Sequence, residues 1–128
     1  MLNRIGQVAI ATADIDRAEA FYRDVLGLRR LYRFGRLAFF DCAGVRLMLE
    51  QPADVADVGR ASPLYFPVAD IALGVRALEE RGVAFTSRPH LIAAMPDHDL
   101  WMAFFTDPDG HVLALMQEAP KGYVPAAG

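Results

Sequence analysis

An internal repeat is the feature that most constrains how this 128-residue chain folds. Three short phrases of the first half return in the same order in the second half. They are "ADI" at 13 and 69, "AFF" at 38 and 103, and "LxL" at 47 and 113, at offsets of 56, 65 and 66 residues. Three phrases in one order indicate two modules of common ancestry rather than chance likeness between strands.

Each half shows the element order strand, helix, strand, strand, strand. In the first half the apolar segment 4–12 predicts a strand, and a helix follows that begins at Asp14 or Asp16 and ends at Gly27. Asp16 and Glu19 have the spacing of a capping box, and Gly27 tolerates the left-handed conformation that ends many helices. The strands "LRRLYRF", "LAFFDC" and "VRLMLEQ" complete this half, with "CAG" as a tight turn.

The second half repeats this order after a polar linker. "PLYFPV" predicts a strand, Asp70 begins the helix "IALGVRALEER", and Gly82 ends it. "VAFTSRPHLIAAM" predicts a long strand, "PDHD" a turn, and "LWMAFFTD" and "HVLALMQE" two strands joined by "DPDG", whose Asp107 and Asp109 we expect to be structural. The expected organisation is a βαβββ module at 1–50, a linker at 51–61, a second βαβββ module at 62–118 and a loose tail at 119–128.

We expect an α+β fold in which each helix covers one face of its own sheet. The other face stays open, so the two modules must curl together into a curved, cup-like mixed sheet. Alternate residues of the strand at 45–50 point to opposite sides. Val45, Leu47 and Leu49 suit the helix side, and Arg46, Met48 and Glu50 suit a lined cavity. A concave, partly apolar cavity with a few polar groups is the usual small-molecule site.

Composition and charge argue against several classes of protein. The net charge is −3 and the basic residues are spread along the chain, so we expect no nucleic-acid partner. The apolar runs are far shorter than the ~20 residues that span a membrane, and the N-terminus lacks the apolar segment of a signal peptide. Cys42 is the single cysteine, so it forms no intrachain disulfide, and we expect an inert thiol and a cytoplasmic location.

Three phrases of the chain resemble the vicinal oxygen chelate superfamily. They are "VAIATADIDRAEAFYRDVLGL", "LAFFDCAGVRLMLEQP" and "MAFFTDPDGHVLAL", and the likeness covers about residues 4–118. The superfamily includes glyoxalase I, methylmalonyl-CoA epimerase, extradiol dioxygenases, fosfomycin-resistance enzymes and the bleomycin-resistance proteins. The resemblance implies the glyoxalase/bleomycin-resistance fold of paired βαβββ modules, usually as a homodimer. It does not select one activity within the superfamily.

The resemblance also implies where a metal ion would bind. Metal-using members take one ligand, a His, Glu or Gln, from the first and the last strand of each module. In this chain the four places hold Gln7, Met48, Pro63 and Ala114. Gln7 offers a carbonyl oxygen and Met48 a soft thioether, whereas Pro63 and Ala114 offer no ligand atom. We therefore expect no metal site and no cofactor.

Three other residues are candidates for catalysis. Glu50 lies on the same side of its strand as Met48, but two residues further along. We expect His98 at a hairpin tip and His90 opposite Phe105, about 17 Å apart, so the two histidines do not share one metal ion. Both are expected to be solvent-facing or hydrogen-bonded, and either one has the chemistry of a general base.

We expect a metal-independent protein that binds a small organic molecule, flat or apolar, in the cup, with a role like that of the bleomycin-resistance proteins. The candidate ligand-binding residues are Gln7, Arg46, Met48, Glu50, Tyr65, Trp101 and Ala114. Tyr65 and Trp101 either stack on the ligand or pack in the core or in a dimer interface. Arg46 and Glu50 either meet charge on the ligand or pair with each other.

Two alternatives remain open. One is an enzyme of the superfamily, a lyase, isomerase or dioxygenase, that holds a metal through Gln7, Glu50 and His90 or uses His90 or His98 as an acid and base. The other is an interaction protein in which side chains fill the cup. A tightly held divalent ion favours the enzyme, and the absence of a cavity favours the interaction protein.

Overall fold

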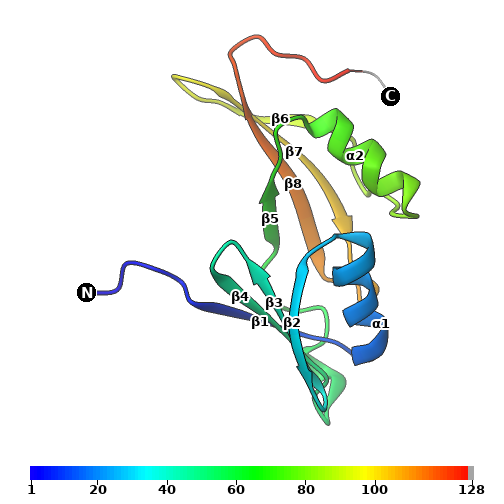
Figure 1. Cartoon of the computed structure of the whole chain (residues 1–128). Helices are drawn as coiled ribbons and strands as arrows, with labels where there is room; N and C mark the ends of the chain where they lie inside the picture. The colour runs from blue at the N-terminus through cyan, green and yellow to red at the C-terminus, as the bar shows by residue number, and fades with distance from the viewer. Residues whose placement is uncertain (127–128) are drawn as a thin grey trace. The chain divides into compact units, whose positions relative to one another are not determined.

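The structure is a computed structural model that describes residues 1–126 and comprises two units. Unit 1 contains Met1–Ala61 together with Asp107–His111, and unit 2 contains Ser62–Thr106 together with residues from 112 onward. Each unit has one four-stranded mixed sheet and one main helix (Figure 1). The expected α+β class and the two βαβββ modules are therefore confirmed. The linker 51–61 belongs to unit 1, and so does the turn between the last two strands of unit 2.

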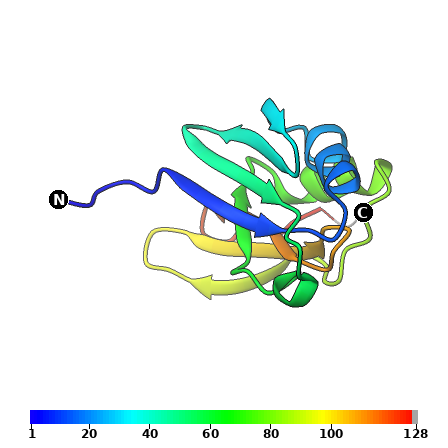
Figure 2. The same cartoon turned by 90° about the horizontal axis from the view of Figure 1, so that it is seen from below.

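Unit 1 has the sheet order β1-β4-β3-β2, in which β1 is parallel to β4 and the other pairs are antiparallel. Its elements are β1 (Gln7–Ala11), α1 (Ile15–Ala20), the π-helical turn η1 (Phe21–Val25), β2 (Arg29–Phe34), β3 (Leu37–Cys42), β4 (Val45–Glu50) and the 3-10 turn η2 (Val55–Asp57). Residues 1–6 precede β1 as an extended segment that points away from the sheet (Figure 2). Because α1 contacts β3 and β4, it covers one face of this sheet.

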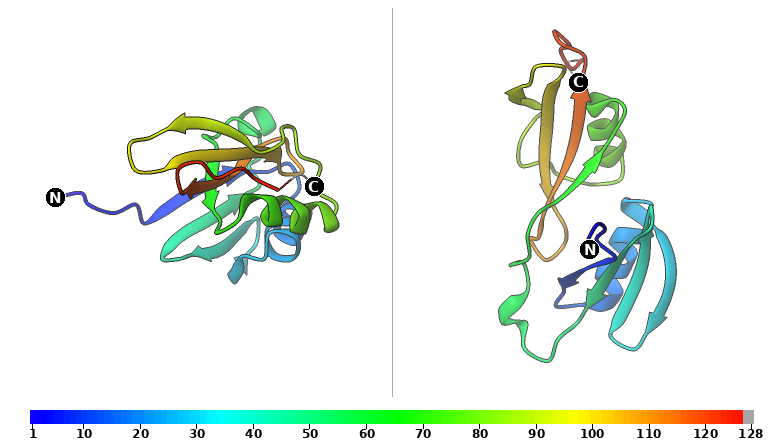
Figure 3. Two further views of the ribbon diagram at one scale, coloured as in Figure 1. Left: turned by 90° about the horizontal axis from the view of Figure 1, so that it is seen from above. Right: turned by 90° about the vertical axis from the view of Figure 1, so that its left-hand side faces the viewer.

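Unit 2 repeats this topology with the order β5-β8-β7-β6 (Figure 3). Its elements are β5 (Leu64–Pro67), α2 (Ile71–Glu80), β6 (His90–Ala94), β7 (Asp99–Thr106) and β8 (Val112–Ala119). The long strand expected over 83–95 is wrong, because only its last part forms β6. Pro89 has no N–H for a ladder and directly precedes β6, while Phe85 makes an isolated bridge to Phe105. His90 pairs with Met102, so the expected place opposite Phe105 is also wrong.

The two main helices begin in the same way. The carboxylate of Asp14 accepts a hydrogen bond from the Arg17 N–H, and the carboxylate of Asp70 accepts one from the Leu73 N–H, each at 3.1 Å. These caps satisfy N–H groups that have no partner inside the helix. Of the two aspartates expected to begin the first helix, Asp14 and not Asp16 is therefore the N-cap residue.

A second cap comes from the end of each last strand. The side-chain oxygen of Gln51 accepts from the Ile15 N–H, and that of Gln117 accepts from the Ile71 N–H, each at 2.9 Å. The two glutamines lie at the repeat offset of 66 residues. The internal repeat therefore extends to hydrogen bonds that fix each helix on its sheet.

The expected capping box of Asp16 and Glu19 is wrong, because Asp14 already occupies the cap position. Asp16 and Glu19 instead pair with Arg33, whose Nη1 lies 2.9 and 3.3 Å from their oxygens. Arg30 adds a contact of 3.1 Å to Glu19. These ion pairs tie α1 to the edge strand β2.

Each core lies between the helix and one face of its sheet. Leu47 and Leu49 of β4 are fully buried, as the alternation along 45–50 predicts. Other buried apolar residues are Ile10, Ile15, Ala18, Tyr22, Ala38 and Phe40 in unit 1, and Ile71, Val75, Ala103, Phe105, Leu113 and Leu115 in unit 2. Burying a side chain of Leu, Ile or Phe size contributes about 1.5–3 kcal/mol, so these layers are the main source of stability in each unit. No helix within residues 1–126 has the length and apolar character needed to cross a membrane.

Candidate ligand-binding site

The face of unit 1 opposite α1 carries a hydrogen-bonded cluster of polar side chains. Gln7 pairs with Arg46 in the parallel ladder, and Met48 lies two residues further along β4 on the same side. The Arg46 Nε donates to the Gln7 Oε1 at 2.9 Å, and the Gln7 Nε2 lies 3.9 Å from the Met48 sulfur. Three of the residues predicted to bind a ligand are thus brought into contact.

Two aromatic rings hold the Arg46 guanidinium from its other side. Tyr32 and Phe39 stack with their centroids 4.6 Å apart, and the Arg46 guanidinium carbon lies 5.6 Å from the Phe39 centroid. The Arg46 Nη1 lies 3.4 Å from the Tyr32 hydroxyl oxygen. A cation over an aromatic face is attracted by the ring quadrupole. The guanidinium is therefore positioned by an amide, a phenol and a ring while it stays exposed.

The same face continues into a cavity of about 370 Å³ at the far end of β1. Its strand residues, Ala9, Ala11 and Glu50, alternate with core residues and so point to the same side as Gln7 and Met48. The linker contributes Pro52, Asp57, Arg60 and Ala61 to the lining of the cavity. The cavity has an apolar floor, a charged rim and the volume of a small-molecule site.

The side chains at the superfamily's metal places do not fit a divalent ion. Gln7 is the one place with an oxygen ligand, and that oxygen accepts a hydrogen bond from the permanently charged Arg46. Met48 supplies a thioether, and Pro63 and Ala114 supply no ligand atom. Among residues 1–126, no three His, Cys, Asp or Glu side chains are grouped as metal ligands would be.

The open face of the unit 2 sheet is aromatic instead of charged. Tyr65 meets Phe104 edge to face with centroids 6.4 Å apart, and the His90 ring lies 6.0 Å from Phe104. The His90 Nδ1 donates to the backbone oxygen of Arg88 at 2.9 Å. Ala114 pairs with Tyr65 and Phe104 in the sheet and is fully buried.

Trp101 does not share a face with Tyr65, so the expectation that both line one cavity is wrong. Trp101 pairs with Gln117, which caps α2 on the helix side of the sheet. Trp101 accordingly lines a space together with Ala72 and Val75 of α2. Side chains alternate along a strand, so Trp101, four residues before the buried Phe105 of β7, is expected on the same side as Phe105.

The two histidine candidates lie at opposite ends of one hairpin. His98 is at the tip, where its backbone oxygen accepts from the Met95 N–H at 2.8 Å and its Nδ1 donates to the Asp97 carboxylate at 2.8 Å. His90 pairs with Met102 at the other end. The tip position of His98 is confirmed, and nothing brings it together with His90.

Among the described residues Arg46 does not pair with Glu50, because its contacts go to Gln7, Tyr32 and Phe39. Glu50 lines the cavity at the end of β1. The cluster also contains Tyr32 and Phe39, which are not among the ligand-binding residues predicted from the sequence. The alternation of "LRRLYRF" and "LAFFDC" beside the 45–50 strand is the signal that places them there.

A buried network surrounds the turn that joins β7 and β8. The Asp107 carboxylate accepts from the Tyr22 hydroxyl at 2.8 Å and from the backbone N–H groups of Asp109 and His111 at 2.9 Å each. Burial and the Asp107 carboxylate raise the pKa of Tyr22. The Asp109 carboxylate accepts from the Ala13 N–H at 3.0 Å and pairs with an arginine of α1 at 2.9 Å. Through these contacts Asp107 and Asp109 have the structural role that the sequence predicts for them.

His111 follows this turn and was not among the predicted residues. Its side chain is fully buried, and neither ring nitrogen has a hydrogen-bond partner among the described residues. Burial lowers the pKa of His111, while the carboxylates of Asp107 and Asp109 act in the opposite direction. The imidazole is therefore neutral at neutral pH.

The family model described as Glyoxalase/Bleomycin resistance protein/Dioxygenase superfamily matches residues 4–115. The chain belongs to this superfamily, in agreement with the resemblance seen in its repeated phrases.

Solved structures with the same fold span different roles. A lactoylglutathione lyase from Agrobacterium tumefaciens is 24% identical, with a TM-score of 0.74, over 91% of this chain and 95% of its own. TnmS3, an antibiotic binding protein from a Streptomyces species, is 23% identical, with a TM-score of 0.74, over 92% and 98%. An integron cassette protein from the mobile metagenome of V. cholerae is 19% identical, with a TM-score of 0.77, over 93% and 98%. At these identities the likeness shows the shared fold alone.

Proposed function

We propose that this protein binds a small, flat organic molecule on the open face of unit 1 without the help of a metal ion. The observation that supports the proposal is the hydrogen bond from Arg46 to Gln7, because a guanidinium then binds the one oxygen among the four side chains at the superfamily's metal places. Substrates of a metal site and ligands of a guanidinium share one need, which is an electron-rich oxygen. The ligand class is therefore an aromatic molecule with a carboxylate, phenolate or carbonyl oxygen.

The donors of Arg46 support this ligand class. A guanidinium has five N–H groups in a planar fork. The described contacts use the N–H on Nε and one of the two N–H groups on Nη1. The remaining N–H groups suit two oxygens of one acidic group. The stacked rings of Tyr32 and Phe39 and the floor at Ala9 and Ala11 supply apolar surface for the body of the ligand.

Titration calorimetry with 2-naphthoate tests the proposal. We expect binding in a metal-free buffer with chelator present, and an affinity at least about tenfold weaker for Arg46→Gln, because a charge-assisted hydrogen bond contributes about 1.5–3 kcal/mol. Arg36→Gln is the matched control, since Arg36 is exposed and its described hydrogen bond is the one that its backbone oxygen accepts from the Gln51 N–H. Binding that requires a divalent ion, or that Arg46→Gln leaves unchanged, contradicts the proposal.

We also propose that the protein acts as a homodimer in the cytoplasm. The dimer is supported by the superfamily, and the compartment by the unpaired, half-buried Cys42, whose pKa is raised by burial and by Asp41. Light scattering after gel filtration should give about twice the chain mass of 14.1 kDa. A particle of one chain mass contradicts the dimer.

A further inference from the structure

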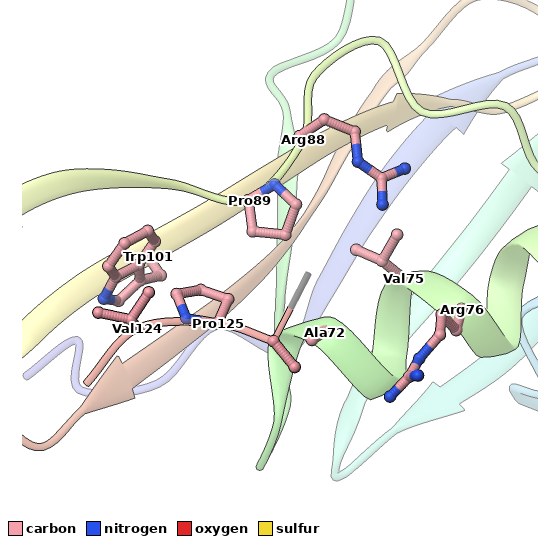
Figure 4. Close-up of a pocket in the computed structure, with 9 residues that line it drawn as sticks. Ala72, Val75, Arg76, Arg88, Pro89, Trp101, Val124 and Pro125 are labelled. Atoms are coloured by element: carbon pink, nitrogen blue, oxygen red, sulfur yellow. The ribbon is translucent and has the colours of Figure 1, made fainter. Parts of the chain in front are cut away.

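Unit 2 has a cavity of about 380 Å³ that no step of the proposed function uses (Figure 4). It lies on the helix side of the sheet, away from the open face that carries Tyr65. Ala72, Val75 and Arg76 of α2 form one side, Pro89 and Trp101 form the other, and residues 124–126 close one end. The volume falls in the range of small-molecule sites.

The walls of this cavity are mainly apolar. Val75 and Ala72 point from α2 toward Pro89 and Trp101, with Pro125 between the tryptophan and the helix (Figure 4). An indole face and proline rings present flat apolar surface without flexible side chains, so little conformational entropy is lost when a ligand packs against them. The cavity therefore suits the apolar body of a small molecule.

Two charged side chains of this cavity have capacity for a ligand. Arg76 forms no ion pair with any described side chain, while Arg88 shares its charge with Glu79 at 2.9 Å. The rim thus has one uncompensated positive charge.

The C-terminal segment keeps the end wall of the cavity in place. The Asp99 carboxylate accepts from the Lys121 Nζ at 2.6 Å and from the Gly122 N–H at 3.1 Å. Tyr123 then packs edge to face on Trp101, with centroids 6.3 Å apart. Residues 121–123, which we expected in a loose tail, are thereby held next to the cavity, and residues 124–126 follow as its wall.

We propose that this cavity is a second binding site, for a small organic carboxylate with an apolar body. The carboxylate pairs with Arg76 and Arg88 at the rim, and the apolar body packs on Trp101 and Pro89. This site lies in unit 2 and on the helix side of its sheet, so it is independent of Arg46 and of the ligand proposed for unit 1.

The fluorescence of Trp101 tests this proposal, because Trp101 is the single tryptophan of the chain. The probe is phenoxyacetate, which has a carboxylate, an aromatic ring and an ether oxygen, and the uncharged control is phenoxyacetamide. We expect a saturable change of tryptophan emission with phenoxyacetate, and an affinity at least about fivefold weaker for the amide. Arg76→Gln should weaken phenoxyacetate about fivefold and leave phenoxyacetamide unchanged.

Three controls separate this site from the rest of the molecule. Arg88→Gln should give a smaller loss than Arg76→Gln, since Glu79 already compensates Arg88. Arg46→Gln and Arg36→Gln should leave the tryptophan response unchanged, so failure of the unit 1 proposal does not affect this test. The absence of a saturable emission change, equal affinity for acid and amide, or an unchanged affinity in folded Arg76→Gln overturns the proposal.

Discussion

The two units share a topology and differ in the chemistry of their open faces. At the repeat offsets, Gln7 of unit 1 corresponds to Pro63 of unit 2, and Arg46 corresponds to Val112. The parallel ladder between β1 and β4 returns between β5 and β8, and Pro63 and Val112 each lie one residue before its first pair, Leu64 with Leu113. The charged cluster of unit 1 is thus replaced by apolar groups in unit 2.

What stays equal between the units is the set of contacts that make the fold. Asp14 and Asp70 cap the helices with bonds of the same length, and Gln51 and Gln117 add the same second cap. The comparison teaches that a few hydrogen bonds and a buried apolar layer specify each βαβββ unit. The side chains on the open face are then free to differ, and they carry the ligand chemistry.

The turns before β4 and β8 have different hydrogen bonds. The Asp41 carboxylate of the first turn accepts from the Gly44 N–H alone among its described side-chain hydrogen bonds, at 3.0 Å. The positive φ angles of Ala43 and Gly44, 51° and 94°, make this turn tight. Its counterpart Asp107 accepts three hydrogen bonds, one of them from the buried Tyr22 hydroxyl.

The largest predicted effect is the loss of the Asp107 carboxylate. Asp107→Ala leaves a buried hydroxyl and two backbone N–H groups without their acceptor, so the free energy of unfolding should fall by about 3 kcal/mol or more. Asp41→Ala at the equivalent place should cost about 0.5–1 kcal/mol, because one half-exposed hydrogen bond is lost. Urea denaturation of the two variants measures both values. Equal losses contradict the difference between the turns.

The second prediction concerns the dependence of stability on pH. Because the pKa of folded His111 lies below its ordinary value of about 6.5, the unfolded chain binds this proton first as the pH falls. The urea midpoint should therefore decline below about pH 6.5 until the folded His111 is itself protonated. His111→Leu should remove this part of the decline.

His90→Gln is the matched control for the pH prediction, because His90 lies exposed at the surface of unit 2. This variant should keep the decline of the wild-type protein. A His111→Leu protein with the same pH profile as the wild type rules out the buried imidazole as its source.

The smallest predicted effect compares equivalent positions in the two helices. Ala18 of α1 is fully buried, so Ala18→Gly should cost about 1–2 kcal/mol through lost helix propensity and lost apolar contact. At the equivalent Gly74 of α2, an added Cβ lies 3.0 Å from the Leu115 Cδ1 and 3.7 Å from Val68. The gain in helix propensity is then offset by crowding, and Gly74→Ala should change stability by less than about 0.5 kcal/mol.

Thermal or urea denaturation of both helix variants gives the comparison. A Gly74→Ala protein that loses as much stability as Ala18→Gly indicates that Leu115 does not yield to the new methyl group. It also shows that the two helices pack more differently than their equal caps suggest.

The sequence predicts those features that depend on local chemistry. Asp14 and Asp70 as caps, Gly27 and Gly82 as helix ends with positive φ, and the turn at Ala43 follow from the conformations that these residues favour. The resemblance to the superfamily locates Gln7 and Met48 at its metal places, and the repeat then locates Pro63 and Ala114. These predictions need no knowledge of distant contacts.

Other features depend on contacts between distant segments. The Tyr22 hydroxyl donates to Asp107, 85 residues away in the sequence, and the Thr12 hydroxyl donates to Asp109, 97 residues away. No local sequence pattern predicts hydrogen bonds over such separations. The fully buried state of His111 follows from the same contacts. Two wrong predictions could have been avoided from local signals. The alternation along β7 indicates the side of the sheet on which Trp101 lies. The missing N–H of Pro89 indicates that the long strand expected before His90 is interrupted.

The most direct test of the account is metal analysis of the purified protein after incubation with Mn²⁺, Ni²⁺ and Zn²⁺ and dialysis. We predict no stoichiometric divalent ion, because Arg46 occupies the oxygen of Gln7 and the other three places have no hard ligand. One ion retained per chain, and lost on Gln7→Ala, contradicts the metal-independent binding site on which the proposed function rests.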